Sequence, residues 1–145
     1  GSAPARKAEE FIEKVFSPKT TEILVCAVNN VTQVMSGYGA LSDEPAQIIN
    51  TEQLIRDIEA NTEANTTQAS KRLEEAGFQT RTKVVKGHPG EELCLLADRE
   101  EVSGIILGRK GAGALAEMLL GSVSSYVVHR ADVPVIVVPE PEADE

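Results

Sequence analysis

Apolar residues recur along this chain in two alternating patterns, one with the period of a strand and one with the period of a helix. Four short runs have the length of strands, three of them apolar, namely 22–28, 105–107 and 135–138, and one alternating, namely 80–85. Four stretches have helical spacing, namely 3–16, 51–76, 91–100 and the residues that follow 122. The pattern therefore predicts helices and strands that alternate along the chain.

The composition of the strand runs indicates where each strand lies in a sheet. Runs 22–28, 105–107 and 135–138 are almost continuously apolar, which is typical of parallel strands covered on both faces. Run 80–85 alternates and is rich in β-branched residues, which favours an edge. The chain is thus expected to form an α/β fold, a doubly wound open parallel sheet with helices on both faces.

Turn residues and charges set further expectations. Gly77 is expected at the C′ position that ends the longest helix. The first helix should be amphipathic, with charged residues such as Glu9 on its polar face. Residues 61–68 form a polar middle section of the long helix, which we expect to be solvated. Residues 29–50 carry turn chemistry without a sustained period and predict a long surface loop.

Length and charge limit the classes of function. A chain of 145 residues fits one domain, 1–139, and the acidic tail 140–145 should be disordered. The net charge of −9 argues against non-specific binding to nucleic acid or to an anionic membrane. We find no apolar run near 18 residues and no leader pattern, and therefore expect no membrane association and a cytoplasmic location.

The cysteines and histidines do not indicate a metal or catalytic site. Cys26 and Cys94 lie far apart among apolar residues, which predicts buried thiols in a reducing compartment. His88 and His129 have no partner at metal-ligand spacing, so structural roles are expected for both. Nucleophile-elbow and P-loop patterns are absent, and we assign no catalytic residue and no metal ligand.

Glycines follow the strand run 105–107 and precede the last helix. Gly108 and Gly111 come directly after the strand, and Gly121 and Ser122 stand at the helix start, with the Ser122 hydroxyl in the N-cap region. Backbone N–H groups at a helix N-terminus, together with the helix dipole, favour an anion. The loop therefore predicts a phosphate site, although glycines also serve purely structural turns.

The spacing Gly-x2-Gly-x9-Gly-Ser, followed by Val123 and Ser124, resembles the nucleotide signature of the ATP-binding branch of the universal stress protein family. The resemblance runs from residue 1 to about 139 and includes the stretches LEEAGF, GHP and PVIVVP. It implies that Val28 lies against adenine and that Leu107 and Gly108 line the nucleotide. It also implies that phosphates are held by Gly111, Gly121, Ser122 and Val123, and that Ser124 is a further nucleotide-binding residue. Two cations in the loop, Arg109 and Lys110, are candidates for neutralising phosphate charge.

The same resemblance implies that residues 1–8 follow the family's first strand. That interior strand, and the aspartate at its end that contacts the ribose, would then be missing from the sheet. Three accounts are open: residues upstream supply the strand, which we favour, or neighbouring strands pair with each other, or a partner supplies a strand. Alternatively, Glu22–Val28 is itself the first strand and Asn29 stands in the place of the aspartate.

Together these observations predict a stress-response or regulatory protein that binds an adenine nucleotide, namely ATP, ADP or AMP, with or without Mg²⁺. We expect a binding module rather than an enzyme. The alternatives are a slow ATPase or phosphotransfer protein, and a dimerisation module that binds no nucleotide. Residues 135–138 form an apolar run at what the resemblance implies is the family's last strand, the edge at which related proteins pair, so we also expect a homodimer through this strand.

Overall fold

The computed structural model describes residues 3–30, 48–109 and 120–140. Its helices and strands alternate in the predicted order: α1 (Ala3–Val15), β1 (Glu22–Asn29), α3 (Ile48–Glu75), β2 (Gln79–Lys86), α4 (Pro89–Arg99), β3 (Ile105–Gly108), α5 (Ser122–Arg130) and β4 (Val135–Val138). Every predicted strand and helix is confirmed to within a few residues at its ends. Most of the predicted loop 29–50 and most of the acidic tail lie outside the described residues.

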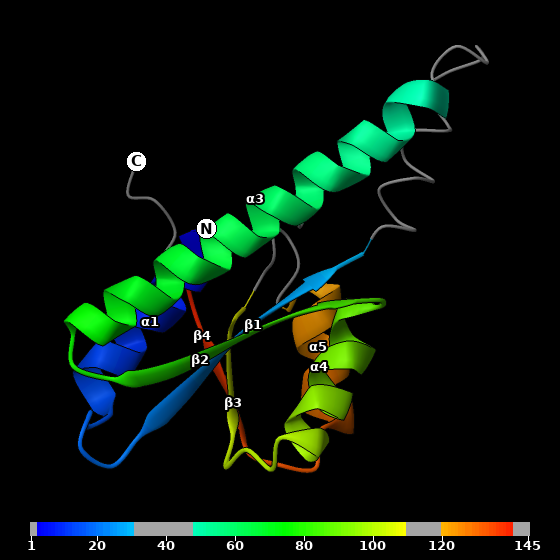
Figure 1. Cartoon of the computed structure of the whole chain (residues 1–145). Helices are drawn as coiled ribbons and strands as arrows, with labels where there is room; N and C mark the ends of the chain where they lie inside the picture. The colour runs from blue at the N-terminus through cyan, green and yellow to red at the C-terminus, as the bar shows by residue number, and fades with distance from the viewer. Residues whose placement is uncertain (1–2, 31–47, 110–119, 141–145) are drawn as a thin grey trace, which may run out of the picture.

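The strands form two parallel pairs (Figure 1). β1 pairs with β2 in the register Glu22↔Gln79, and β3 pairs with β4 in the register Ile105↔Val135. Across the described part of the chain, no ladder joins β1 to β3. Among the described strands β2 has β1 as its single neighbour, in keeping with the predicted edge position, and β1 and β3 are not paired with each other. The described strands therefore form two separate parallel pairs rather than one continuous ladder.

Helices cover both sides of the strands, as a doubly wound fold requires. In Figure 1, α1 and α3 lie on one side of the strand pairs, and α4 and α5 pack together on the other. A core cluster of Ile12, Leu73 and Phe78 joins α1 and α3 to the strands. Phe16, Ile23, Val25 and Ile106 pack against this cluster. Both strand pairs therefore belong to one layer between two layers of helices.

The strands themselves are less buried than their apolar sequences predict. The apolar residues of β1 and β3 are only partly buried, and Val138 of β4 is the one strand hydrophobic in the described core. A parallel strand becomes fully covered only when it has neighbours on both edges as well as helices on both faces. Within the described residues β1 and β3 each have one strand neighbour, so their apolar residues are only partly buried although helices lie on both faces as predicted.

The long helix α3 ends as predicted and is tied to α1 by an ion pair. Gly77 has a φ of +100°. The Phe78 N–H donates to the Leu73 carbonyl over 3.0 Å, as in a Schellman cap. Glu9 is 7% exposed, not on a solvated face as predicted, because it accepts hydrogen bonds from Nε and Nη2 of Arg72, each 2.8 Å long.

The polar middle of α3 is partly buried, so the prediction of a solvated section is wrong there. Thr66 is 5% exposed, and its hydroxyl donates to the Thr62 carbonyl over 2.8 Å. Such a bond inside the helix lets a threonine face the strands without leaving its hydroxyl unpaired. Burial of this helix face therefore depends on local hydrogen bonds as well as on apolar packing.

The two cysteines are free thiols that are half-buried, rather than fully buried as predicted. Burial raises the pKa of the Cys26 thiol to about 11. Burial and the neighbouring carboxylate of Asp98 also raise the pKa of Cys94. Both thiols are therefore protonated at neutral pH and unreactive as nucleophiles.

Candidate functional site

The candidate site is centred on the carboxyl end of β3, where Gly108 meets the start of α1. A Cβ atom added to Gly108 would stand 2.6 Å from the Pro4 Cβ and 3.1 Å from the Pro4 carbonyl oxygen. Only a glycine fits here, because ordinary carbon contacts are about 3.5 to 4.0 Å. The start of α1 is thus brought to the end of β3, a contact that no sequence motif indicated.

The start of α5 forms the second part of the site. Its N-cap is Gly121, not Ser122, and no side chain caps the helix. Ser122 is therefore the first helical residue, and the prediction of its hydroxyl as the cap is wrong. The N–H groups of Ser122, Val123 and Ser124 fall in the first turn, where a helix offers them no partner of its own. An uncapped first turn of this kind favours an anion at its end.

Backbone hydrogen bonds fix the start of α5 against the end of the β3–β4 pair. The Arg109 N–H donates to the Val138 carbonyl over 3.0 Å, and the Gly121 N–H donates to the Arg109 carbonyl over 2.9 Å. The Ser124 hydroxyl donates to the Gly108 carbonyl over 2.7 Å, and Ser124 is 2% exposed. The Ser124 side chain therefore holds the two elements together, which leaves its backbone N–H as the group that faces the helix end.

Arg109 stands between these elements and has an unpaired donor. Its Nε is buried, and no hydrogen-bond acceptor for it lies within the described residues. A buried donor without a partner costs about 1 to 3 kcal/mol, and more when the group is charged. An anion at this end of β3 would supply the missing acceptor.

The remaining predicted site residues are divided between the two strand pairs. Leu107 faces Val137 in the register of the β3–β4 pair, whereas Val28 faces Val85 in the β1–β2 pair. Leu107 and Val28 are partly buried at the ends of their strands. Both thus lie at the carboxyl ends of parallel strands, where ligands bind in doubly wound folds. Lys110 and Gly111 lie outside the described residues.

Asn29, the alternative candidate for the ribose, is already engaged. It is 5% exposed, and its Oδ1 accepts a hydrogen bond of 2.7 Å from the Thr62 hydroxyl of α3. Its carbonyl accepts a bond of 3.0 Å from the Gly87 N–H. These bonds give Asn29 a structural role at the end of β1.

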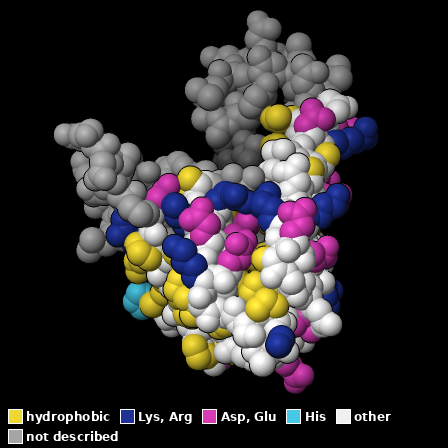
Figure 2. All heavy atoms as spheres, turned by 90° about the vertical axis from the view of Figure 1, so that its left-hand side faces the viewer, with side chains coloured by type: hydrophobic (Ala, Val, Ile, Leu, Met, Phe, Trp, Pro, Cys, Tyr) yellow, Lys and Arg dark blue, Asp and Glu magenta, His cyan; other side chains and the backbone are white. Residues whose placement is uncertain are grey.

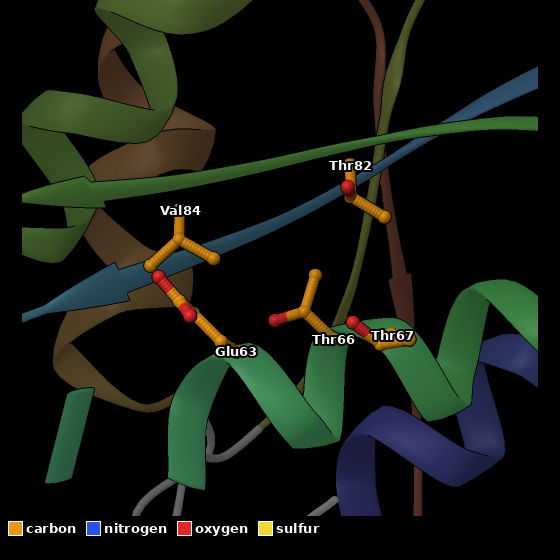
Figure 3. Close-up of a pocket in the computed structure, with 5 residues that line it drawn as sticks. All are labelled: Glu63, Thr66, Thr67, Thr82 and Val84. Carbon is orange, nitrogen blue, oxygen red and sulfur yellow. The ribbon is translucent and has the colours of Figure 1, made fainter. Parts of the chain in front are cut away.

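A separate hollow of about 300 Å³ lies between α3 and β2 (Figure 3). Glu63, Thr66 and Thr67 come from the helix, and Thr82 and Val84 come from the strand. None of the predicted site residues lines this hollow. It is therefore distinct from the site at the end of β3.

Charged side chains of both signs are mixed on the face of the molecule that Figure 2 shows. The face in Figure 2 carries Lys and Arg next to Asp and Glu rather than one extended basic surface. On β2, Arg81 bonds Glu22 over 2.6 Å and Glu100 over 2.9 Å. Hydrogen bonds from Arg81 and Lys83 lower the pKa of Glu100. This mixture protects the exposed edge of β2 from pairing with other chains.

The described helices also bear on membrane association. None of them combines the length and the apolar character that a bilayer span requires.

Comparison with known proteins gives consistent matches. The model of the universal stress protein family matches residues 1–139. The Arabidopsis thaliana universal stress protein PHOS34 is 40% identical over 90 residues, which make up 59% of this chain and 35% of PHOS34. The Methanocaldococcus jannaschii universal stress protein MJ0577 is 43% identical over 68 residues, or 47% of this chain and 42% of MJ0577. The matched part thus spans less than half the length of either relative.

Solved structures share the fold. The structure of MJ0577 matches with a TM-score of 0.80 and 26% identity, covering 98% of this chain and 92% of that chain. An Arabidopsis thaliana universal stress protein family protein with AMP bound matches with a TM-score of 0.62 and 18% identity, covering 99% of this chain and 82% of that one. The likeness to the AMP-bound structure extends to the fold alone.

Proposed function

This chain belongs to the universal stress protein family, and on that premise we propose that it binds an adenine nucleotide, with its phosphates at the start of α5. In this proposal the first-turn N–H groups of Ser122, Val123 and Ser124 bind phosphate oxygens. Leu107, Gly108 and Val28 line the nucleoside. The predicted phosphate contacts of Gly111 and Lys110 belong to the same proposal.

The single observation that carries the proposal is the uncapped N-terminus of α5 beside Gly108 and Arg109. Gly121 leaves the first turn without a side-chain acceptor. The buried Nε of Arg109 also lacks an acceptor within the part of the chain that is described. One phosphate group would satisfy both sets of donors, because its oxygens accept several hydrogen bonds at once.

The relatives support the choice of ligand. An Arabidopsis thaliana member of the fold was solved with AMP bound. Adenine nucleotides therefore come first among the anions to test on this chain. ATP and ADP are included because the Gly-x2-Gly-x9-Gly-Ser spacing resembles the ATP-binding branch of the family. Mg²⁺ is tested with ATP as a companion of the phosphates.

The experiment is a calorimetric titration of the chain with ATP, ADP, AMP and adenosine, with and without Mg²⁺. We expect each nucleotide to bind more tightly than adenosine, because adenosine lacks the anion. Ser122→Asp places a carboxylate at the first helical position, where it suits the helix dipole but repels phosphate. This variant should lose more than tenfold in affinity, about 1.4 kcal/mol, and should keep the parent's stability.

Ser122→Ala is the matched control, because it removes the same hydroxyl without adding charge. We expect it to bind within a few-fold of the parent, since the proposal assigns the backbone N–H, not the hydroxyl, to the phosphate. Equal affinities for ATP and adenosine, or unchanged binding by Ser122→Asp, would show that α5 does not hold the phosphate.

We further propose a homodimer through β4. Within the described residues β4 has a strand neighbour on one edge only. The Val138 carbonyl accepts from Arg109 of the β3 side, so the backbone groups of Val135 and Val137 point to the other edge. An apolar edge strand of this kind invites pairing with a second copy. Light scattering at tens of micromolar should give the mass of two chains, and a monomer would refute the dimer.

A further inference from the structure

The hollow between α3 and β2 is formed by side chains that share one face of each element. Thr66 and Thr67 follow Glu63 by three and four residues, and residues so spaced are neighbours on one side of a helix. Thr82 and Val84 are two residues apart and therefore share one face of the strand. In Figure 3 these side chains extend from the two elements around a common space. Helix and strand thus build one hollow of about 300 Å³.

The walls of the hollow offer hydrogen-bond acceptors. The carboxylate of Glu63 can only accept. Thr66 is 5% exposed, and its hydroxyl already donates its proton to the Thr62 carbonyl over 2.8 Å, so the lone pairs of its oxygen are what remains for a ligand. Figure 3 shows this oxygen on the side of Thr66 that faces Glu63. A ligand that suits these walls must therefore bring donors, which a phosphate or a carboxylate does not.

Two other carboxylates on the same side of α3 show what Glu63 lacks. One turn before it, the Lys86 Nζ lies 2.7 Å from the Glu59 Oε1, close enough for an ion pair although the angle is not that of a hydrogen bond. Beyond the hollow, the Glu74 Oε1 accepts from the Thr80 hydroxyl over 2.6 Å. Within the described ranges, no hydrogen bond or ion pair involves Glu63. The carboxylate between the two bonded ones is thus without a partner there.

The sequence of β2 explains this difference. Lys86 and Val84 are two residues apart and lie on the same face of the strand. Lys86 brings an ammonium to Glu59, whereas Val84 brings no charge to Glu63. Figure 3 shows the Glu63 side chain extending toward Val84. The hollow therefore lies where charge pairing between the helix and the strand is interrupted, and an ammonium from outside would continue it.

The donor set favours an ammonium over a metal ion. Ca²⁺ and Mg²⁺ are held by several carboxylate, carbonyl or water oxygens in a fixed shell, whereas a single carboxylate and hydroxyls line this hollow. No three His, Cys, Asp or Glu side chains of the described residues are grouped so that they could hold a metal ion. A primary ammonium has three N–H donors for such acceptors. The other cations of β2, Arg81 and Lys83, are paired with Glu100 and do not fill the hollow.

We propose that the hollow binds a primary ammonium on a short aliphatic chain. The Glu63 carboxylate is its counter-ion, the Thr66 and Thr82 oxygens accept its remaining hydrogen bonds, and the Val84 methyl groups contact the chain. A volume of about 300 Å³ equals that of about ten water molecules, which leaves room for about four carbons. Glu63, Thr67 and Thr82 are exposed, so the amine enters directly from solvent. This site is separate from the proposed nucleotide site and does not depend on it.

The test is an NMR titration of the full chain with butylammonium at pH 7. Saturable shifts should appear at Thr66, Thr82 and Val84, with a dissociation constant on the order of 1 mM for so small a ligand. Butan-1-ol has the same chain without the charge, and tetramethylammonium has the charge without an N–H donor. Each of these two should bind at least tenfold more weakly than butylammonium.

Three variants locate the site. Glu63→Gln keeps the shape of the side chain without its charge and should weaken butylammonium binding at least tenfold at an unchanged urea midpoint. Glu52→Gln is the matched control, because it makes the same charge change on α3 about three turns earlier, roughly 16 Å away, and should bind as the parent does. Thr82→Lys supplies an ammonium from the strand, as Lys86 does for Glu59, and should abolish binding.

The following results would overturn the proposal. Equal binding of butylammonium and butan-1-ol would show that the hollow has only an apolar contact to offer. Shifts that do not saturate, or that Glu52→Gln reduces as much as Glu63→Gln does, would show a general attraction of cations to an acidic chain. Binding that persists in both Glu63→Gln and Thr82→Lys would place the amine elsewhere, and an absence of shifts up to 50-fold the expected dissociation constant would leave the hollow to water.

Discussion

Gly108→Ala tests the close contact on which the candidate site depends. The new Cβ would lie 2.6 Å from the Pro4 Cβ. Ordinary carbon contacts are about 3.5 to 4.0 Å, so Pro4 and the start of α1 must retreat by about 1 Å. Overpacking of this kind costs about 1 to 3 kcal/mol. This cost comes from the steric overlap and not from the backbone conformation, because Gly108 is not among the described residues with a positive φ.

The assay compares urea unfolding and nucleotide affinity of Gly108→Ala with those of Gly104→Ala. Gly104 lies just before β3, and its added Cβ would meet the Pro134 carbonyl oxygen at 3.2 Å, a much smaller overlap. Gly104→Ala should therefore change the free energy of unfolding by less than about 1 kcal/mol, since alanine also reduces the entropy of the unfolded chain.

The nucleotide arm separates stability from function. Displacing the start of α1 changes the part of the site that Pro4 and Gly108 form at the end of β3. The nucleotide affinity of Gly108→Ala should therefore fall by more than the loss of folded protein alone would explain. If Gly108→Ala unfolds at the same urea concentration as Gly104→Ala, the start of α1 is not packed against β3 and the reasoning is refuted.

Three further predictions concern stability and reactivity. Glu9→Gln should lower the free energy of unfolding, measured in urea, by about 1 to 3 kcal/mol, because Arg72 loses its carboxylate partner. The Arg72 side chain is 28% exposed, so water screens part of this ion pair. An unchanged urea midpoint would contradict the prediction. Gly77→Ala should cost about 1 to 2 kcal/mol at a φ of +100°, and a cost no larger than that of an ordinary helix-surface alanine would argue against the left-handed cap. Cys26 should be alkylated at pH 8 far more slowly than in urea, with a rate that rises towards its pKa of about 11. Because the pKa of Cys26 in the folded chain lies above the ordinary value of 9.0, the contribution of Cys26 to stability is present below pH 9 and is lost as the pH rises from about 9 to about 11. Equal alkylation rates at pH 8 with and without urea would refute the burial of the thiol.

The sequence alone determined where helices and strands begin and end. Apolar period, strand length and turn residues are local properties, so the run Val135–Val138 and the cap at Gly77 were predicted at the positions observed. The glycine positions around β3 and α5 likewise indicated the end of the sheet at which a ligand is expected. The absence of pairing between β1 and β3 followed from the family resemblance rather than from periodicity.

Tertiary structure decided which polar side chains form hydrogen bonds within the fold and which remain free. Glu9 belongs to the polar set of an amphipathic helix, yet it is buried because Arg72, 63 residues away in sequence, reaches it. Ser124 resembles a ligand contact in the motif, but its hydroxyl is bonded to Gly108 across 16 residues. Such partners meet only when separate elements pack, and no local pattern encodes the meeting.

The same reason explains what the sequence missed at the site. The approach of Pro4 to Gly108 and the buried Nε of Arg109 depend on how α1 and α5 dock on β3. The partial exposure of β1 and β3 depends on strand neighbours, which the apolar character of a strand does not reveal. Hydrophobic pattern fixes which faces are to be buried, whereas the contacts that bury them are long-range and are decided only when the sheet and its helices assemble.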